Sequence, residues 1–317
     1  MTAATSPLGR LGCGPSCGGS WEFRNPRPPL ATEVLWRREH ELGTIEKITF
    51  TCEPGSDAVA FVCLPRNVQP PYPFFICLQG HSTGMHLSIG VDRDDNSQAI
   101  VVERDYDFGL GCLRRGVAAL CLEQRAFGER REQHQEIRTT HGCQDAAMHA
   151  LMLGRTLAGE RTFDVGRALD YLETRDDVDW ARVGAMGNSG GGTITMFAAA
   201  LHERLRFAMP SCSFCTFRDS IMAIRHCVDN YIPGLLVEAE MADVMGLFAP
   251  RPLVIVAGQD DPIFPVEATR TAFAALERIY RAAGAEENCR LVIGPEGHRF
   301  YAELGWGQML PMLGMAR

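Results

Sequence analysis

Short apolar runs alternate with amphipathic segments through most of the chain. The runs have the length of buried strands and lie at residues 74–78, 116–122, 183–186, 205–209, 252–257 and 289–293. Segments with the spacing of helices lie between several of them, at residues 106–115, 144–157, 160–174 and 266–281. Strands that alternate with helices are typical of a parallel sheet built from βαβ units. We therefore predict an α/β fold, with a mostly parallel, doubly wound sheet and helices on both faces.

The segments outside this alternation predict how the rest of the chain is organised. Residues 1–30 are rich in Gly, Pro and Ser without periodicity, so we expect a poorly ordered or draped arm before a domain at residues 31–317. Residues 32–42 have the pattern of a short charged helix, and residues 44–53 and 58–64 that of an antiparallel hairpin at the sheet edge. Residues 211–250 are too long for a connection. They predict an insertion over the carboxyl edge of the sheet, where it would help to form a pocket.

A glycine-rich stretch after the run at residues 183–186 has the pattern G-x-S-x-G. It consists of Gly187-Asn188-Ser189-Gly190-Gly191, and a helical pattern follows it. A serine at the tip of a sharp strand-to-helix turn has a strained backbone, and only residues with little side chain fit beside it. The alternative is a glycine-rich turn with an incidental serine. We predict that Ser189 is a nucleophile and that the amide of Gly190 points at a developing oxyanion.

A serine nucleophile needs a base, and the base needs an acid that orients it. In sheets of this type the base follows the nucleophile and the acid along the chain. His298 lies in a loop directly after the last predicted strand, where a base is expected. His202 lies on the helix that the motif opens, and His226 lies in the insertion. His298 is therefore the predicted base.

The acid should follow the strand before the last one. Two aspartates, Asp260 and Asp261, come after the run at residues 252–257. Asp261 lies directly before a Pro-Ile-Phe-Pro turn that precedes the next helix, so we favour it and keep Asp260 as the alternative. A second oxyanion donor is expected after an early strand, where the amide of His81 is our first choice and that of Ser82 the second. The His81 side chain would contact substrate or pack.

Together these motifs resemble an α/β-hydrolase of the acetyl xylan esterase and dienelactone hydrolase-like group, from about residue 45 onward. The resemblance is carried by Gln79-Gly80-His81, Gln124-Arg125-Ala126-Phe127-Gly128-Glu129, Gly187-Asn188-Ser189-Gly190-Gly191, residues 258–265 and Glu296-Gly297-His298. It implies a nucleophile at Ser189, an acid at Asp261 and a base at His298. It also implies hydrolysis of small acyl esters, such as acetyl esters, through an acyl-enzyme without a cofactor. Dienelactone hydrolases proper use a cysteine nucleophile, so the serine favours the esterases. Acetyl xylan esterases are often oligomeric, which makes a homo-oligomer a hypothesis here.

Composition and charge restrict the classes of binding partner that we expect for this protein. A net charge of -8 over 317 residues, with no basic run, argues against a nucleic-acid surface. No stretch is long and apolar enough to span a bilayer, so we expect no membrane partner and a small-molecule ester as the substrate. Several of the 12 cysteines lie in apolar runs, and the N-terminus does not show the pattern of a secretory signal. We therefore expect a reduced, cytoplasmic protein.

Three other hypotheses remain. A serine peptidase or amidase of the prolyl-oligopeptidase type shares the core, but the segment before the predicted hairpin is too short for the β-propeller of those enzymes. Cys212 and Cys215 form a C-x-x-C pattern that His226 and Cys227 follow, a spacing that can bind zinc or form a reversible disulfide. Two buried thiols explain the pattern more simply, so we expect no metal. A catalytically silent binding protein would lack a triad member, and none is missing.

Overall fold

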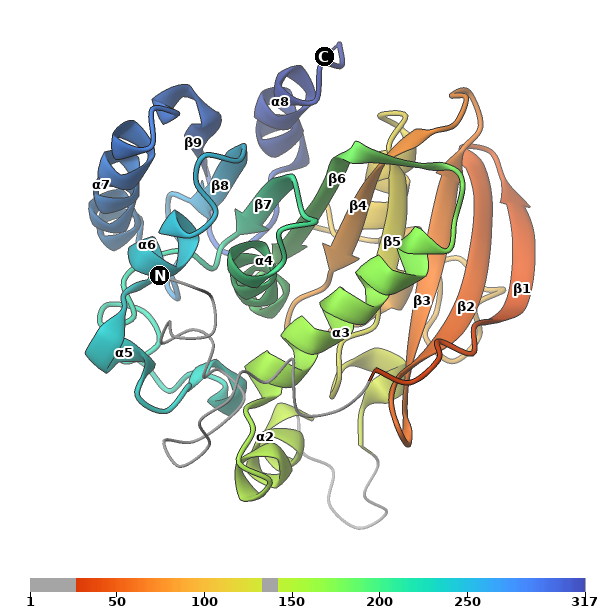
Figure 1. Ribbon diagram of the computed structural model, residues 1–317, viewed down its shortest axis with the longest axis horizontal. Helices are drawn as coiled ribbons and strands as arrows, with labels where there is room; N and C mark the ends of the chain where they lie inside the picture. Colours follow the sequence, from red (N-terminus) through yellow and green to blue (C-terminus); the bar gives the residue numbers. More distant parts are fainter. Residues whose placement is uncertain (1–26, 133–141, 317) are drawn as a thin grey trace.

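The computed structural model describes residues 27–132 and 142–316, which form a nine-stranded sheet with helices around it (Figure 1). The strands are β1 Glu33–His40, β2 Gly43–Glu53, β3 Ser56–Pro65, β4 Tyr72–Leu78, β5 Ala118–Leu122, β6 Val178–Asn188, β7 Phe207–Ser211, β8 Leu253–Gly258 and β9 Cys289–Gly294. Their order across the sheet is β1-β2-β3-β5-β4-β6-β7-β8-β9. Pairing is antiparallel from β1 to β5 and parallel from β5 to β9. The fold is that of an α/β-hydrolase, as predicted.

Helices follow most of the parallel strands. They are α1 Phe108–Leu113, α2 Cys143–Met152, α3 Leu157–Glu173, α4 Gly190–Leu201, α5 Leu235–Glu238, α6 Met241–Gly246, α7 Val266–Ala282 and α8 Ala302–Met312. Short 3-10 helices lie at η4 Met85–Ile89, η5 Gly128–Arg130, η6 Val228–Asn230 and η7 Glu286–Asn288.

The side chains of β4 show why both faces of the sheet are covered. Successive residues of a strand point to opposite faces. Accordingly, Phe74 and Ile76 belong to one buried core and Phe75 and Cys77 to another. The first core includes residues of α3, α4 and α7, and the second includes residues of α1 and α8. Figure 1 shows α3 and α4 crossing in front of the strands. The predicted doubly wound sheet is thus confirmed.

The first described strand corrects the sequence analysis. The predicted hairpin is present as β2 and β3, but residues 32–42 form β1 outside it, so the prediction of a helix there is wrong. Trp36 packs on Phe61 with 5.5 Å between ring centroids, and Arg37 pairs across the strands with Glu46 at 3.3 Å. At least one of the charged residues that suggested a helix, Arg37, thus pairs with a residue of the neighbouring strand. Charged side chains are common on edge strands because they discourage pairing with other chains.

The sequence predicts two segments outside the alternation of strands and helices, an arm at residues 1–30 and an insertion at residues 211–250. Residues 1–26 of the predicted arm lie outside the described residues. At its end, Arg27 pairs with Asp170 of α3 at 2.9 Å, and the carbonyl of Leu30 accepts a hydrogen bond from the amide of Thr51 at 2.6 Å. The predicted insertion at residues 211–250 carries η6, α5 and α6. Within the described ranges, no helix has both the length and the apolar character needed to cross a membrane.

Candidate active site

Ser189 lies between the end of β6 and the start of α4, the strand–turn–helix context that its motif requires. Its φ of 56° and ψ of -123° lie in a region that residues with side chains rarely adopt. Two glycines make this turn feasible. A Cβ at Gly187 would lie 2.6 Å from the backbone of Gly191, and a Cβ at Gly191 would lie 2.0 Å from the carbonyl oxygen of Leu78. No side chain fits at either position, so the strained backbone of Ser189 requires glycine at residues 187 and 191.

The structure pairs Asp261 with His298. Oδ2 of Asp261 lies 2.7 Å from Nδ1 of His298. Oδ1 of the same carboxylate accepts hydrogen bonds from the amides of Ile263 at 2.8 Å and Phe264 at 3.2 Å. The Asp261 side chain is 0% exposed and that of His298 is 18% exposed. A buried carboxylate at Nδ1 favours the tautomer with its proton there and leaves Nε2 free to accept one. The alternative acid, Asp260, is exposed to solvent.

The predicted nucleophile, acid and base gather at one edge of the sheet. They follow β6, β8 and β9, which run parallel, and the carboxyl ends of parallel strands meet at the same edge. Short contacts cross this edge. The amide of Ser189 donates to the carbonyl of Ser211 at 2.9 Å, and Sγ of Cys212 donates to the carbonyl of Arg299 at 3.1 Å. The end of β7 therefore links the serine to the loop that holds the histidine.

The loop after β4 passes directly against the nucleophile. A Cβ at Gly80 would lie 3.2 Å from Cβ of Ser189 and 3.0 Å from the carbonyl oxygen of Asn188. A larger residue at this position would clash with the strand-to-helix turn at Ser189, which we call the elbow. The amide of His81, the first predicted oxyanion donor from this loop, comes next along the chain, followed by Ser82 with a φ of 62°. This close approach is what a loop that supplies an oxyanion donor needs.

The side chain of His81 belongs to a buried ion-paired network that the sequence analysis missed. Nε2 of His81 lies 3.0 Å from each carboxylate oxygen of Asp229, and Arg161 of α3 pairs with the same carboxylate. Burial lowers the pKa of His81, but the Asp229 carboxylate outweighs it and raises that pKa to about 9. Asp229 closely follows His226 and Cys227 in sequence. Nothing local indicated that it would meet the loop after β4.

Cys212 and Cys215 do not share a partner. Sγ of Cys212 bonds the carbonyl of Arg299, whereas Sγ of Cys215 lies 3.8 Å from the carbonyl oxygen of Pro265. Among the residues described, no cluster of metal-binding side chains contains both cysteines. Burial raises the pKa of Cys212 to about 12, so this thiol keeps its proton at neutral pH.

Cys227 lies instead with Cys143, His81 and Asp229, whose polar atoms are all within 4.8 Å of one another. A hydrogen bond from Cys227 lowers the pKa of Cys143 to about 5 against the opposing effect of burial. Arg161 donates to Sγ of Cys143 at 3.3 Å and pairs with Asp229. The guanidinium therefore supplies positive charge to the two acidic groups of the cluster.

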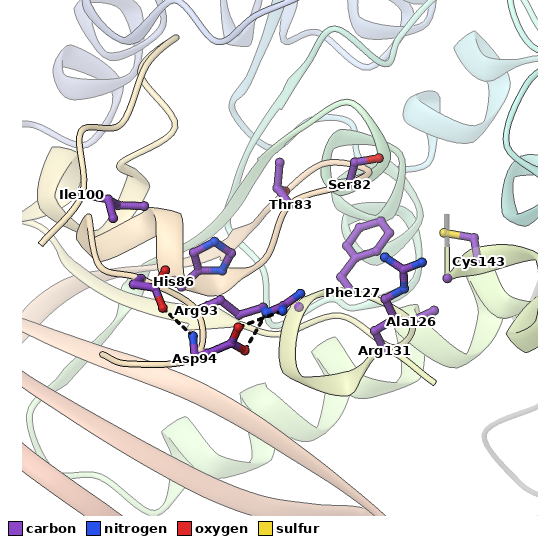
Figure 2. A pocket seen from close by; sticks show the side chains of 13 residues that line it. Ser82, Thr83, His86, Arg93, Asp94, Ile100, Ala126, Phe127, Arg131 and Cys143 are labelled. Atoms are coloured by element: carbon purple, nitrogen blue, oxygen red, sulfur yellow. Dashed lines mark hydrogen bonds and ion pairs between the residues drawn. The ribbon is translucent and has the colours of Figure 1, made fainter. Parts of the chain in front are cut away.

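A pocket of about 290 Å³ adjoins the loop that carries His81 (Figure 2). Ser82 and Thr83 of this loop line it, together with Phe127 and the ion pair between Arg93 and Asp94, which lies at 2.9 Å. Figure 2 shows this pair and the ring of Phe127 around the same space. Ser189, Asp261 and His298 do not line this pocket, and Ser82, which directly follows His81, links it to the loop after β4.

Known proteins resemble this chain in sequence and in fold. The family model of acetyl xylan esterase (AXE1) matches residues 122–232. YtaP of Bacillus subtilis, a hydrolase by name, is 25% identical over 279 residues, which cover 86% of this chain and 88% of YtaP. A solved structure from Bacteroides fragilis, described as an acetyl xylan esterase, superposes with a TM-score of 0.70 at 17% identity and covers 86% of this chain and 71% of that chain. One from Klebsiella pneumoniae, described as a dienelactone hydrolase, has a TM-score of 0.55 at 19% identity, with 83% and 95% covered. The resemblance to this group is confirmed, and ester hydrolysis is supported as the reaction class.

Proposed function

We propose that this protein is a serine esterase that cleaves carboxylic esters through an acyl-enzyme on Ser189. The observation that carries the proposal is the 2.7 Å contact between Asp261 and His298, made at the edge of the sheet where the strained serine lies. A buried acid, an oriented imidazole and an elbow serine are the parts that nucleophilic acyl transfer requires.

In the proposed reaction, Nε2 of His298 takes the proton of the Ser189 hydroxyl as its oxygen attacks the ester carbonyl. The tetrahedral intermediate collapses when His298 gives that proton to the departing alcohol, which leaves the acyl group on the serine. A water molecule, activated by the same imidazole, then releases the acid. Asp261 stays ionised throughout, holds the ring in place and stabilises the imidazolium that forms.

The negative charge that develops on the carbonyl oxygen needs donors that are already in position. We assign this role to the amides of Gly190 and His81. The amide of Gly190 is at the start of α4, where amides are not used by the helix and the helix dipole favours an anion. Gly80 packs close to Ser189, which supports the amide of His81 as the second donor.

The names of the relatives favour acetyl esters of carbohydrates as the first substrates to test. The pocket that adjoins Ser82 would take part of the alcohol, because its polar walls suit hydroxyl groups better than a long acyl chain. A peptidase or amidase of the same core remains the second hypothesis, and hydrolysis of a p-nitroanilide would distinguish it from an esterase.

The test is hydrolysis of p-nitrophenyl acetate by the purified protein beside the Ser189→Ala variant. We expect kcat to fall by at least about 10⁴-fold in the variant, because the nucleophile is lost while the oxyanion site remains. A fluorophosphonate should label Ser189 in the wild type and not in the variant, as read by mass spectrometry. Activity that persists in a folded Ser189→Ala protein would overturn the proposal.

A further inference from the structure

Four side chains that can bind metal ions converge beside the loop after β4. They are His81, Cys143, Cys227 and Asp229, and one nitrogen, sulfur or oxygen atom of each lies within 4.8 Å of those of the other three. His81 belongs to that loop, Cys143 begins α2, and Cys227 and Asp229 lie in the insertion at η6. The cluster therefore joins three segments that are far apart in the sequence.

The atoms of this cluster and their spacing suit a tetrahedral zinc ion. Zinc binds thiolate sulfur at about 2.3 Å and imidazole nitrogen or carboxylate oxygen at about 2.0–2.2 Å, so two of its ligand atoms lie about 3.3–3.8 Å apart. In the cluster, Nε2 of His81 lies 3.0 Å from each carboxylate oxygen of Asp229, and the four ligand atoms are all within 4.8 Å of one another. Adjustments of about 1 Å would therefore enclose an ion of this size.

Hydrogen bonds link the four groups through protons that a metal ion would replace. His81 bonds to Asp229 and to Cys143, and Cys227 bonds to Cys143. Zinc binds thiolates and neutral imidazole, so its binding releases such protons to solvent. Thiolate ligands also favour zinc over magnesium and calcium, which prefer oxygen ligands.

Buried neighbours hold the acidic members of the cluster in place. Arg161 donates to Sγ of Cys143 at 3.3 Å and pairs with Asp229. Two hydrogen bonds to the carbonyl of Arg125, at 2.9 and 2.8 Å, fix the guanidinium in turn. Nδ2 of Asn230 donates to Oδ1 of Asp229 at 3.0 Å. Hydrogen bonds of this kind orient the side chains that bind a metal and stabilise their charged forms.

The positive charge of Arg161 is compatible with a divalent cation beside it. Two thiolates and the Asp229 carboxylate would carry three negative charges, which the guanidinium and a divalent ion balance together. The Asp229 side chain is 3% exposed and that of Arg161 is 1% exposed. Charges that are buried so deeply are stable only when they are compensated.

An ion can reach the cluster from solvent. Cys143 lines the pocket of about 290 Å³, and Figure 2 draws its thiol among the residues around this space. Cys227 is only partly buried. The cluster thus has an entry path, which a metal site needs.

We propose that His81, Cys143, Cys227 and Asp229 bind one zinc ion as a structural site. The ion takes the place of the two thiol protons and of the proton that His81 shares with Asp229, and it ties the loop after β4 to α2 and η6. Four protein ligands leave a tetrahedral ion no position for a reacting water, so the site is separate from the proposed ester hydrolysis. No metal was expected from the spacing of Cys212 and Cys215, and neither residue belongs to this cluster.

The experiment measures metal binding by the full-length, reduced protein. The wild type is stripped with dipicolinate and reloaded with Zn²⁺ in competition with a chromophoric chelator, or with Co²⁺ for spectroscopy. We expect about one zinc per chain, with a Kd below about 1 µM. The Co²⁺ form should show thiolate-to-metal charge transfer in the near ultraviolet and the strong visible absorption of a tetrahedral site. Zinc should also raise Tm, because an ion that binds only the folded chain stabilises it.

Single cysteine variants test which thiols bind the ion. Cys143→Ser and Cys227→Ser should each weaken zinc binding by at least about 100-fold, since even the loss of a group that only supports a metal ligand can cost that much. Each should also reduce the charge-transfer absorption of the Co²⁺ form. Cys215→Ser is the matched control, because it makes the same change at a buried thiol outside the cluster, and it should bind zinc as the wild type does. Ser189→Ala should also keep its zinc, which separates this test from that of the esterase.

Three results would overturn the inference. The first is a reduced wild type that binds neither Zn²⁺ nor Co²⁺ with a Kd below about 1 µM. The second is undiminished zinc binding in folded Cys143→Ser and Cys227→Ser, which would place the ion elsewhere. The third is a disulfide between Cys143 and Cys227 in peptide maps, with no zinc binding after its reduction, which would make the two thiols a redox pair. If a variant does not fold, the Co²⁺ spectrum of the wild type decides, and a spectrum without thiolate charge transfer refutes the site.

Discussion

Asp261→Asn tests the acid–base pair most directly, because the backbone dictates how the new side chain must lie. Oδ1 of Asp261 accepts amide hydrogen bonds from Ile263 at 2.8 Å and Phe264 at 3.2 Å. An asparagine has one carbonyl oxygen, which must take this place because its NH2 group cannot accept a hydrogen bond. The NH2 group would then face Nδ1 of His298 across the present 2.7 Å contact. Two donors cannot share that contact, so the imidazole must move its proton to Nε2.

A His298 protonated at Nε2 cannot accept the proton of Ser189. The same exchange in a serine protease lowers kcat by about 10⁴-fold, which corresponds to about 5 kcal/mol of lost transition-state stabilisation. Asp261 is 0% exposed, so bulk water has no access with which to relieve the mismatch. We therefore expect kcat for p-nitrophenyl acetate to fall by about 10³- to 10⁴-fold in Asp261→Asn, with little change in KM.

Asp260→Asn is the matched control, since it makes the same chemical change one residue away on an exposed side chain. Steady-state kinetics of both variants, with circular dichroism to establish that they are folded, give the comparison. Asp260→Asn should keep the wild-type kcat. A loss below about tenfold in Asp261→Asn, or a larger loss in Asp260→Asn, would refute the assignment of the acid.

Three further predictions concern stability around the site. Gly191→Ala would put a Cβ 2.0 Å from a carbonyl oxygen of β4. It should displace the elbow and lower both activity and Tm, and an unchanged Tm would contradict this. Asp164 is buried and accepts three hydrogen bonds from two arginines, so Asp164→Asn should lower the free energy of unfolding in urea by about 3–5 kcal/mol. Asp94→Asn, which breaks an exposed pair of similar geometry, should leave the urea midpoint unchanged, and equal effects would refute the role of burial. Burial raises the pKa of Glu123 from 4.5 to about 7. Between these pH values the native state keeps a proton that the unfolded chain has lost, so stability falls as pH rises, by up to about 3 kcal/mol. Glu123→Gln should remove that part of the slope in urea titrations, and an equal slope in both proteins would contradict it.

The turn at Ser189 and the contact between Asp261 and His298 could be predicted because each depends on a local requirement of the chain. Gly187 and Gly191 are needed where no Cβ fits, so the strained position of Ser189 is evident from its neighbours. Asp261 and His298 each follow a buried strand directly, and parallel strands bring their carboxyl ends to one edge. Of the two aspartates, Asp261 contacts the imidazole of His298 and Asp260 is exposed, which is the arrangement that the prediction requires. Their catalytic roles stay predictions.

The features that escaped prediction depend on contacts between distant segments. Nothing in residues 32–42 shows that Arg37 will pair with Glu46 across two strands instead of within a helix. The helix α8 was not predicted, and with Gly305, Gly307 and Pro311 it lacks the composition of a helix former and is stabilised by packing of Trp306 in the core. Tertiary contacts override local propensity in both cases.

The network around His81 joins the insertion to the loop after β4, which carries the proposed second oxyanion donor. His81 and Asp229 are 148 residues apart, and Asp229 lies on η6 within the insertion. The sheet positions Ser189, Asp261 and His298, whereas the insertion supplies the Asp229 carboxylate, which outweighs burial and raises the pKa of His81. Substitutions in η6 would then change the surroundings of His81 while leaving the contact between Asp261 and His298 intact. In the proposed mechanism, the loop after β4 is therefore supported by a segment that contributes none of the residues Ser189, Asp261 and His298.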